Sequence, residues 1–83
     1  MGGIMTLQLS LFEIIKTAIQ SDIDHGYLDA QLDVLDPQTV RIVEADGVEH
    51  SLTLVDGICR LDGCVVSDES EVRDAINYAF YME

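Results

Sequence analysis

The chain has 83 residues, 48% of them hydrophobic, so it can bury one modest core and is too apolar for a disordered acidic tail. Sixteen acidic residues oppose four basic ones, and the resulting net charge of −12 repels nucleic acid and anionic lipid while attracting basic surfaces. These values argue against direct binding to DNA, RNA or a membrane. The sequence shows neither a secretory signal nor an apolar run of membrane-spanning length, so we expect a cytoplasmic protein.

Residues 1–9 are predicted to be an N-terminal extension, either a tag remnant ahead of Met5 or a short strand. A single α+β domain is then expected over residues 10–83. Its first helix should begin at Ser10, because Ser10-Leu11-Phe12-Glu13 fits a capping box, and it should end near Gly26. The apolar residues between these limits recur at helical spacing: Leu11, Ile14, Ile15, Ala18 and Ile19.

An antiparallel meander of four strands is predicted to follow. Apolar and polar residues alternate from Leu28 to Val34, which is typical of a half-buried strand. The turn at Asp36-Pro37-Gln38 then pairs Val34 with Val40. The sequence therefore predicts a core face that continues from the first strand into the second.

Asp-Gly pairs set the next two turns. A three-residue loop at Ala45-Asp46-Gly47 pairs Val40 with Leu52 and Ile42 with His50, whereas a two-residue loop would mix the two faces. For the next turn, a two-residue loop at Asp56-Gly57 suits a type I′ turn. It places these core-facing residues on one side: Leu52, Leu54, Cys59 and Leu61.

A second helix is predicted near the C-terminus. Asp68 and Glu71 have the spacing of a capping box, and the apolar residues after them recur at helical spacing: Val72, Ala75, Ile76, Ala79 and Phe80. The order is therefore α-β-β-β-β-α, with both helices on the Leu52/Leu54 face of the sheet. The Asp62-Gly63 pair is either a tight hairpin or a connector to the second helix.

No catalytic residue, metal ligand or cofactor site can be assigned from the sequence. Cys59 and Cys64 are five residues apart, unlike the knuckles of structural zinc sites, so we expect them to be packed thiols. The histidines lie far apart, and His50 should be partly buried with a local partner. The acids around His25 lack the spacing of an EF-hand loop. We therefore expect a protein that is not an enzyme.

The acids are more informative, because several turns should place them along one rim of the sheet. The expected partner-binding residues are Asp22, Asp24, Asp46, Glu49 and Asp62, joined by Asp68, Glu69 and Glu71 if the chain enters the second helix directly. A tight hairpin at Asp62-Gly63 would send the last three to the other rim. Clustered carboxylates can stand in for phosphates, which favours an inhibitor of a nuclease or other nucleic-acid-binding protein.

Two alternatives accompany this hypothesis. The acids are also typical of a domain adapted to high salt, in which they are solvated everywhere and report no partner. Separately, the outer face of the sheet offers an apolar surface for a homodimer, formed by Val43, Val55 and Ile58.

Overall fold

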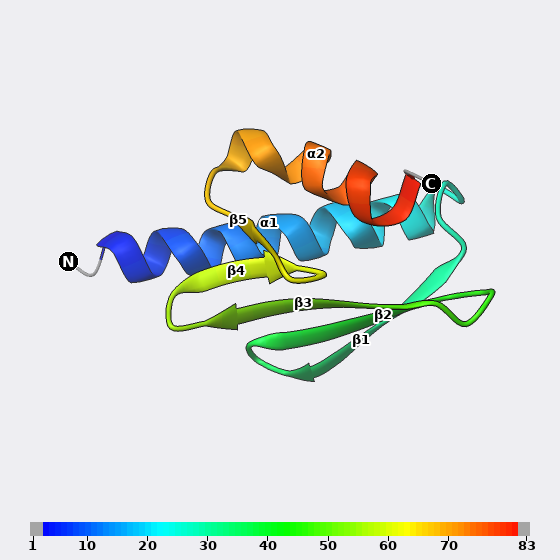
Figure 1. Ribbon diagram of the computed structural model, residues 1–83, viewed down its shortest axis with the longest axis horizontal. Coiled ribbons are helices and arrows are strands. Elements are labelled where there is room, and N and C mark those ends of the chain that lie inside the picture. The colour runs from blue at the N-terminus through cyan, green and yellow to red at the C-terminus, as the bar shows by residue number, and fades with distance from the viewer. Residues whose placement is uncertain (1–2, 82–83) are drawn as a thin grey trace.

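The computed structural model describes the backbone of residues 3–81 and the side chains of residues 11–81. This part of the chain forms a long helix, a five-stranded antiparallel sheet and a short C-terminal helical segment (Figure 1). The strands lie in the sheet in chain order, from β1 to β5. The α+β class is as predicted, but the count of four strands is wrong by one.

Helix α1 runs from Gly3 to Asp24, so a beginning at Ser10 and a strand within residues 5–9 are both wrong. The capping pattern at Ser10 lies inside α1, so it does not mark the N-terminus of the helix. Phe12 lies on the same face of α1 as Ile15 and Ile19, because the three are spaced at helical intervals, and all three side chains are buried. The predicted end is confirmed: Gly26 has a φ of +80°, and its amide donates to the Ile23 carbonyl at 3.1 Å.

The five strands are short, with three to seven residues each. Their bounds are β1 (Ala30–Asp36), β2 (Thr39–Glu44), β3 (Glu49–Val55), β4 (Ile58–Leu61) and β5 (Cys64–Val66). Every predicted register is confirmed: Val34 lies opposite Val40, and Val40 lies opposite Leu52. Leu54 likewise lies opposite Cys59. The agreement follows from turn geometry, since a slip of one residue would send the apolar side chains to the solvent face.

The two tight turns have left-handed backbones. Asp56 and Gly57 have φ angles of 54° and 74°, which confirms the predicted two-residue turn. Asp62 and Gly63 have φ angles of 55° and 83° and form a second such turn. This turn pairs β4 with β5. Of the two alternatives predicted for Asp62-Gly63, the tight hairpin is therefore the correct one, and the strand that follows it is the fifth of the sheet.

The two cysteines differ in burial. Cys59 faces the core, as predicted, but Cys64 is exposed, so its expected packing is wrong. Cys64 follows the Asp62-Gly63 turn and lies opposite Leu61 at the margin of the sheet. The two residues therefore cannot be neighbours across the ladder.

The C-terminal segment changes its winding twice. It comprises a 3₁₀ turn η1 (Glu69–Glu71), the α-helix α2 (Val72–Ile76) and a π-helical turn η2 (Asn77–Tyr81). Glu71 reaches back to the start of this segment and accepts a hydrogen bond from the Ser67 amide at 2.9 Å. The predicted apolar stripe is confirmed, because Val72 and Ile76 are buried and the rest of the stripe packs against them.

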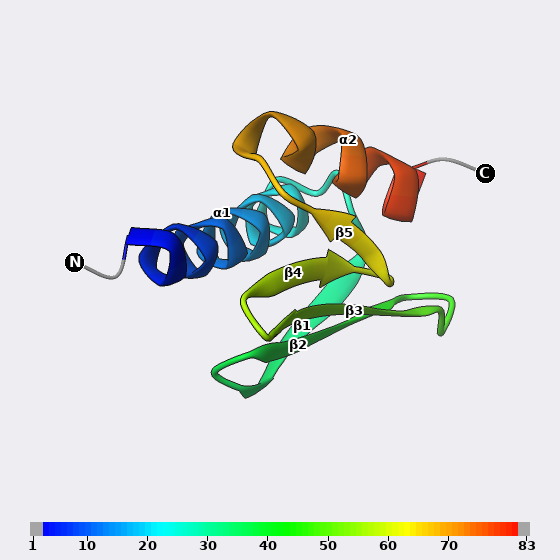
Figure 2. The ribbon, with the colours of Figure 1, turned by 60° about the vertical axis from the view of Figure 1, so that its left-hand side comes forward.

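Both helices contribute to a core on one face of the sheet. Figure 2 shows α1 lying against the strands and α2 above them, on the side where β5 lies, and α2 contacts both α1 and β5. The largest fully buried side chains come from both helices and the three middle strands: Phe12, Ile15, Ile19, Ile42, Leu52, Leu61 and Ile76. Within residues 3–81, no helix is both long and apolar enough to cross a membrane.

The core makes a first prediction. Replacing Ile19, which is 0% exposed, with alanine should lower the free energy of unfolding by about 2–5 kcal/mol, because the cavity cannot fully collapse. The matched substitution Ile58→Ala, at an exposed position, should cost less than about 1 kcal/mol. Urea denaturation measures both values. Equal losses in the two variants would contradict this position of the core.

Candidate functional site

His50 lies between two carboxylates on the core face of the sheet. Its Nδ1 is 2.6 Å from Oδ2 of Asp62, and its Nε2 is 2.6 Å from Oε2 of Glu44. The ring of Phe80 packs on the imidazole with the centroids 4.3 Å apart. A partly buried histidine with a local partner was predicted; the side chain is 7% exposed and has two partners.

Both ring nitrogens of His50 face acceptors, and this arrangement favours the protonated ring. A neutral imidazole has one donor and one acceptor, whereas imidazolium donates from both nitrogens. Burial, the largest single influence, lowers the pKa of His50, but the hydrogen bonds and charges of Asp62 and Glu44 together raise it above its usual value. The cluster is therefore a cation held by two anions.

Asp22 forms a second buried polar cluster, which joins α1 to the C-terminal segment. Nη1 and Nη2 of Arg73 donate to its two carboxylate oxygens at 3.0 and 3.4 Å, and the Tyr81 hydroxyl donates at 2.8 Å. The hydrogen bond from Arg73 has the largest effect and lowers the pKa of Asp22, against the opposing effect of burial. Burial and the bond to Asp22 raise the pKa of Tyr81 to about 12.

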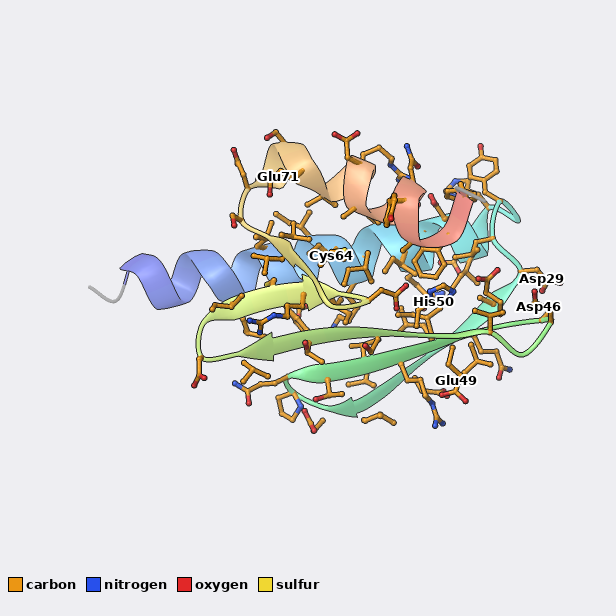
Figure 3. The ribbon with its side chains drawn as sticks, viewed as in Figure 1. Asp29, Asp46, Glu49, His50, Cys64 and Glu71 are labelled. Atoms are coloured by element: carbon orange, nitrogen blue, oxygen red, sulfur yellow. The ribbon has the colours of Figure 1, made fainter. Side chains whose placement is uncertain are left out.

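Four exposed carboxylates belong to the segments at one end of the molecule, namely the end of α1, the connection to β1 and the turn from β2 into β3. We call Asp24, Asp29, Asp46 and Glu49 the acidic end (Figure 3 labels the last three). Asp29 was missed by the sequence reasoning, because it lies just before β1 and belongs to no turn signal. Its carbonyl accepts a hydrogen bond from the Ala45 amide at 2.9 Å, and this contact brings it beside Asp46.

Two acids of the predicted rim contact cationic side chains within the fold. Asp22 is 7% exposed and bonded to Arg73, so its predicted place on an exposed binding rim is wrong. Asp62 lies at the expected end of the sheet, but its carboxylate contacts His50 and accepts from the Ser51 amide at 3.2 Å. Neither carboxylate is available to a partner without breaking an internal contact.

The acids of the C-terminal segment lie elsewhere. Because Asp62-Gly63 is a tight hairpin, β5 runs back along β4 and the segment begins at the opposite end of the molecule (Figure 1). Asp68, Glu69 and Glu71 are exposed there, and Figure 3 shows Glu71 far from Asp29 and Asp46. Of the two predicted alternatives, the tight hairpin that sends these three acids to the other rim is therefore confirmed, and they do not join the acidic end.

The outer face of the sheet carries the predicted apolar residues. Val55 and Ile58 are exposed and lie opposite each other, and Val43 is half-buried. Val65 adds to this face, and it was missed because β5 was not predicted. The surface is apolar, but its valines and isoleucine are interspersed with polar residues such as Arg60.

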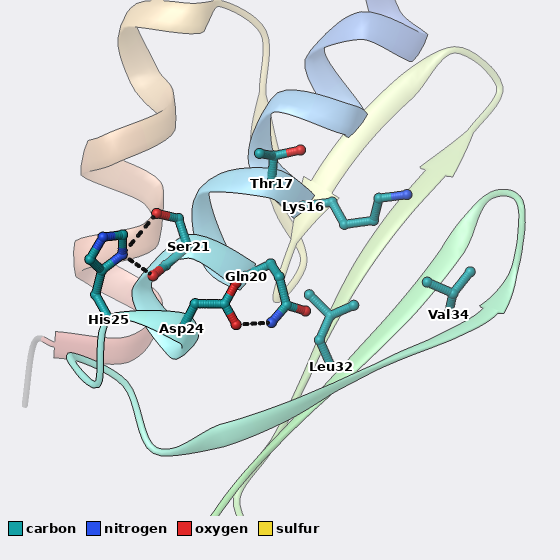
Figure 4. Close-up of a pocket in the computed structure, with 8 residues that line it drawn as sticks. All are labelled: Lys16, Thr17, Gln20, Ser21, Asp24, His25, Leu32 and Val34. Atoms are coloured by element: carbon teal, nitrogen blue, oxygen red, sulfur yellow. Dashed lines mark hydrogen bonds between the residues drawn. The ribbon is translucent and has the colours of Figure 1, made fainter.

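A groove of about 400 Å³ separates α1 from the edge strand β1 (Figure 4). Helix residues form one wall and strand residues the other: Lys16, Gln20, Ser21 and Asp24 face Leu32 and Val34. Leu32 is half-buried and Val34 is 56% exposed, although both belong to the face of the sheet that α1 covers. The helix therefore leaves this edge of the core face partly uncovered.

Within residues 11–81, no group of three or more histidine, cysteine or acidic side chains is arranged to hold a metal ion. No protein-family model matches the chain, and neither the curated proteins nor the solved structures contain a significant match to it.

The His50 cluster predicts a pH dependence. The folded state binds the proton of His50 more tightly than the unfolded chain, in which a histidine has a pKa of about 6.5. The stabilisation is therefore complete below about pH 6.5 and is lost as the pH rises through the raised folded pKa. The variant His50→Gln should lose this decline in the free energy of unfolding, measured by urea denaturation from about pH 6 to about pH 9.

The control for this experiment is His25→Gln. His25 is exposed, contacts Ser21 in the last turn of α1 and stacks on Tyr27, with no carboxylate hydrogen-bonded to its ring in the described residues, so this variant should retain the decline. A decline of equal size in His50→Gln and in the wild type would rule out His50 as its source.

The Asp22 cluster predicts a stability difference between two neighbouring aspartates. Asp22→Asn should lower the free energy of unfolding by about 1–2 kcal/mol, because the charge-assisted bonds from Arg73 and Tyr81 are lost. Asp24→Asn, at an exposed site, should change it by less than about 0.5 kcal/mol. The pKa of Asp22 is lowered, so its contribution should disappear only as the pH falls below about 3.8. Similar denaturation curves for the two variants at neutral pH would contradict the assignment.

Proposed function

We propose that the chain is a non-enzymatic acidic binding module that mimics nucleic-acid phosphates and masks the basic surface of a nuclease or nucleic-acid-binding protein. The observation that carries this proposal is the acidic end. Its four carboxylates are exposed, and no lysine, arginine or histidine of the described side chains forms an ion pair with any of them. They repel one another, and a basic partner would relieve that repulsion.

The basic residues do little to offset this field, because most are engaged elsewhere. Of the four lysine and arginine side chains, three contact a carboxylate within the domain: Lys16 with Glu13, Arg41 with Asp33 and Arg73 with Asp22. A basic partner is therefore steered toward the molecule, and its association should slow as salt rises.

The size of the charge limits what can be mimicked. The molecule is 42 Å long, and duplex DNA of this length carries about 25 charges, at one per 1.7 Å or so of axis. The net charge of −12 is about half of that. The proposal is therefore a module that covers one basic patch through its acidic end, and not a replacement for a whole duplex.

A displacement experiment tests the proposal. Proteins of the host lysate are bound to immobilised duplex DNA at low salt, and the domain is added to release its partner. The triple variant Asp29→Asn, Asp46→Asn, Glu49→Gln should release at least about tenfold less of that partner, because it lacks three of the four carboxylates of the acidic end.

The matched control is Asp36→Asn, Asp56→Asn, Glu69→Gln, which changes the net charge equally at the opposite end of the molecule. This variant should release the partner almost as well as the wild type. Equal release by both triple variants, or no release by the wild type, would count against the proposal.

A further inference from the structure

Strand β1 has an open edge. Within residues 3–81, β2 is the only strand that pairs with it. Hydrogen-bonded and non-hydrogen-bonded pairs alternate in an antiparallel ladder, and the Asp29 carbonyl already bonds to Ala45 on the β2 side. The backbone groups of Gln31 and Asp33 therefore face β2. Those of Ala30, Leu32 and Val34 point away from the sheet.

The open edge and the groove coincide. Leu32 and Val34, whose backbone groups point outward, are also the residues whose side chains form the strand wall of the groove. A strand added to this edge would place its own side chains opposite theirs, over the same apolar surface and against α1 (Figure 4). Many proteins bind an extended peptide by adding it as a strand to an exposed sheet edge, with pockets beside the edge for its side chains.

The charge on the other face of β1 indicates which kind of strand would pair with this edge. On the other face of β1, Asp29 and Asp33 stand on either side of Gln31, and all three are exposed. Asp33 also lies 3.7 Å from Nη2 of Arg41, in an exposed ion pair of the kind that contributes little and exchanges readily. A second copy of this chain would bring its own aspartates against these, with a net charge of −12 on each molecule. A segment with basic side chains on that face would instead be attracted.

We infer that the edge of β1 and its groove receive an extended basic segment of a partner protein, which pairs antiparallel with residues 30–34 as a sixth strand. Its apolar side chains enter the groove beside Leu32 and Val34, and its basic side chains alternate with them along Asp29 and Asp33. The inference rests on the proposed function in that the partner is basic. It adds the form in which that partner binds.

The length of the site is set by β1 itself. A register shift between Val34 and Asp36 ends the regular pairing. Three residues with outward backbone groups precede this shift, so an added strand can form hydrogen-bonded pairs with Ala30, Leu32 and Val34. A segment of seven residues is long enough to cover them.

The probe is an acetylated and amidated heptapeptide of alternating lysine and valine, titrated at low salt by calorimetry. In the inferred register its valine amides donate to β1. N-methylation of all three valines should therefore weaken binding at least about tenfold. N-methylation of three lysines is the matched control, with the same charge and the same number of methyl groups, and it should change the affinity by less than about twofold.

The protein offers a complementary variant. Val34→Pro removes one outward amide without removing a bond to β2, and proline is tolerated at sheet edges. It should weaken binding of the unmethylated heptapeptide at least about tenfold, whereas Val34→Ala should weaken it less than about threefold.

The outcomes separate this inference from the proposed function. Equal affinity for all three peptides, with strong salt dependence, would overturn strand addition and leave attraction by the acidic residues intact. Absence of binding by every peptide would also overturn the inference. The displacement experiment would still decide the proposed function.

Discussion

The left-handed backbone at the two Asp-Gly turns constrains the rest of the sheet. Residues with positive φ at both central positions match the twist of a two-residue hairpin, and such a hairpin admits one register. From the Asp56-Gly57 turn, this register puts Leu52, Leu54 and, by alternation, His50 on the core face. The Asp62-Gly63 turn then brings a carboxylate to the end of β4, within reach of His50.

Local signals explain which parts of the fold the sequence could predict. Turn chemistry and alternation act over fewer than ten residues or so, and every register that depends on them was predicted correctly. The predicted start of α1 was wrong, because the four-residue capping pattern at Ser10 can also occur inside a helix. Strand β5 has only three residues, too few for an alternating pattern, so Asp62-Gly63 was its only signal.

The candidate site was harder to predict, because tertiary contacts decide which acids are exposed. Asp22 and Arg73 are 51 positions apart, and nothing near Asp22 in the sequence indicates that a cation will cover it. Asp29 reaches the acidic end only through the contact of its carbonyl with Ala45. The total charge was therefore readable from the sequence, whereas the division into paired and exposed carboxylates was not.

The C-terminal segment connects the two buried polar clusters. Phe80 packs on the His50 ring, and the next residue, Tyr81, bonds to Asp22. Both belong to the π-helical turn η2, whose wider winding ends the chain described by the structure. One cluster contains an arginine, whose charge is permanent, and the other contains a histidine, whose charge depends on pH. The same short turn therefore packs on the histidine of one cluster and bonds to the aspartate of the other.

Asp62 has to satisfy two requirements at once. Its φ of 55° suits glycine or asparagine better than a charged residue, while its carboxylate holds the imidazole of His50. Glycine at this position would relax the backbone and lose the ion pair, and glutamate would keep a carboxylate but fit the turn poorly. Asparagine would suit the turn and retain an acceptor without the charge. Asparagine is therefore the substitution at position 62 that separates turn formation from tertiary pairing, because it keeps the left-handed turn and removes only the charge that faces His50.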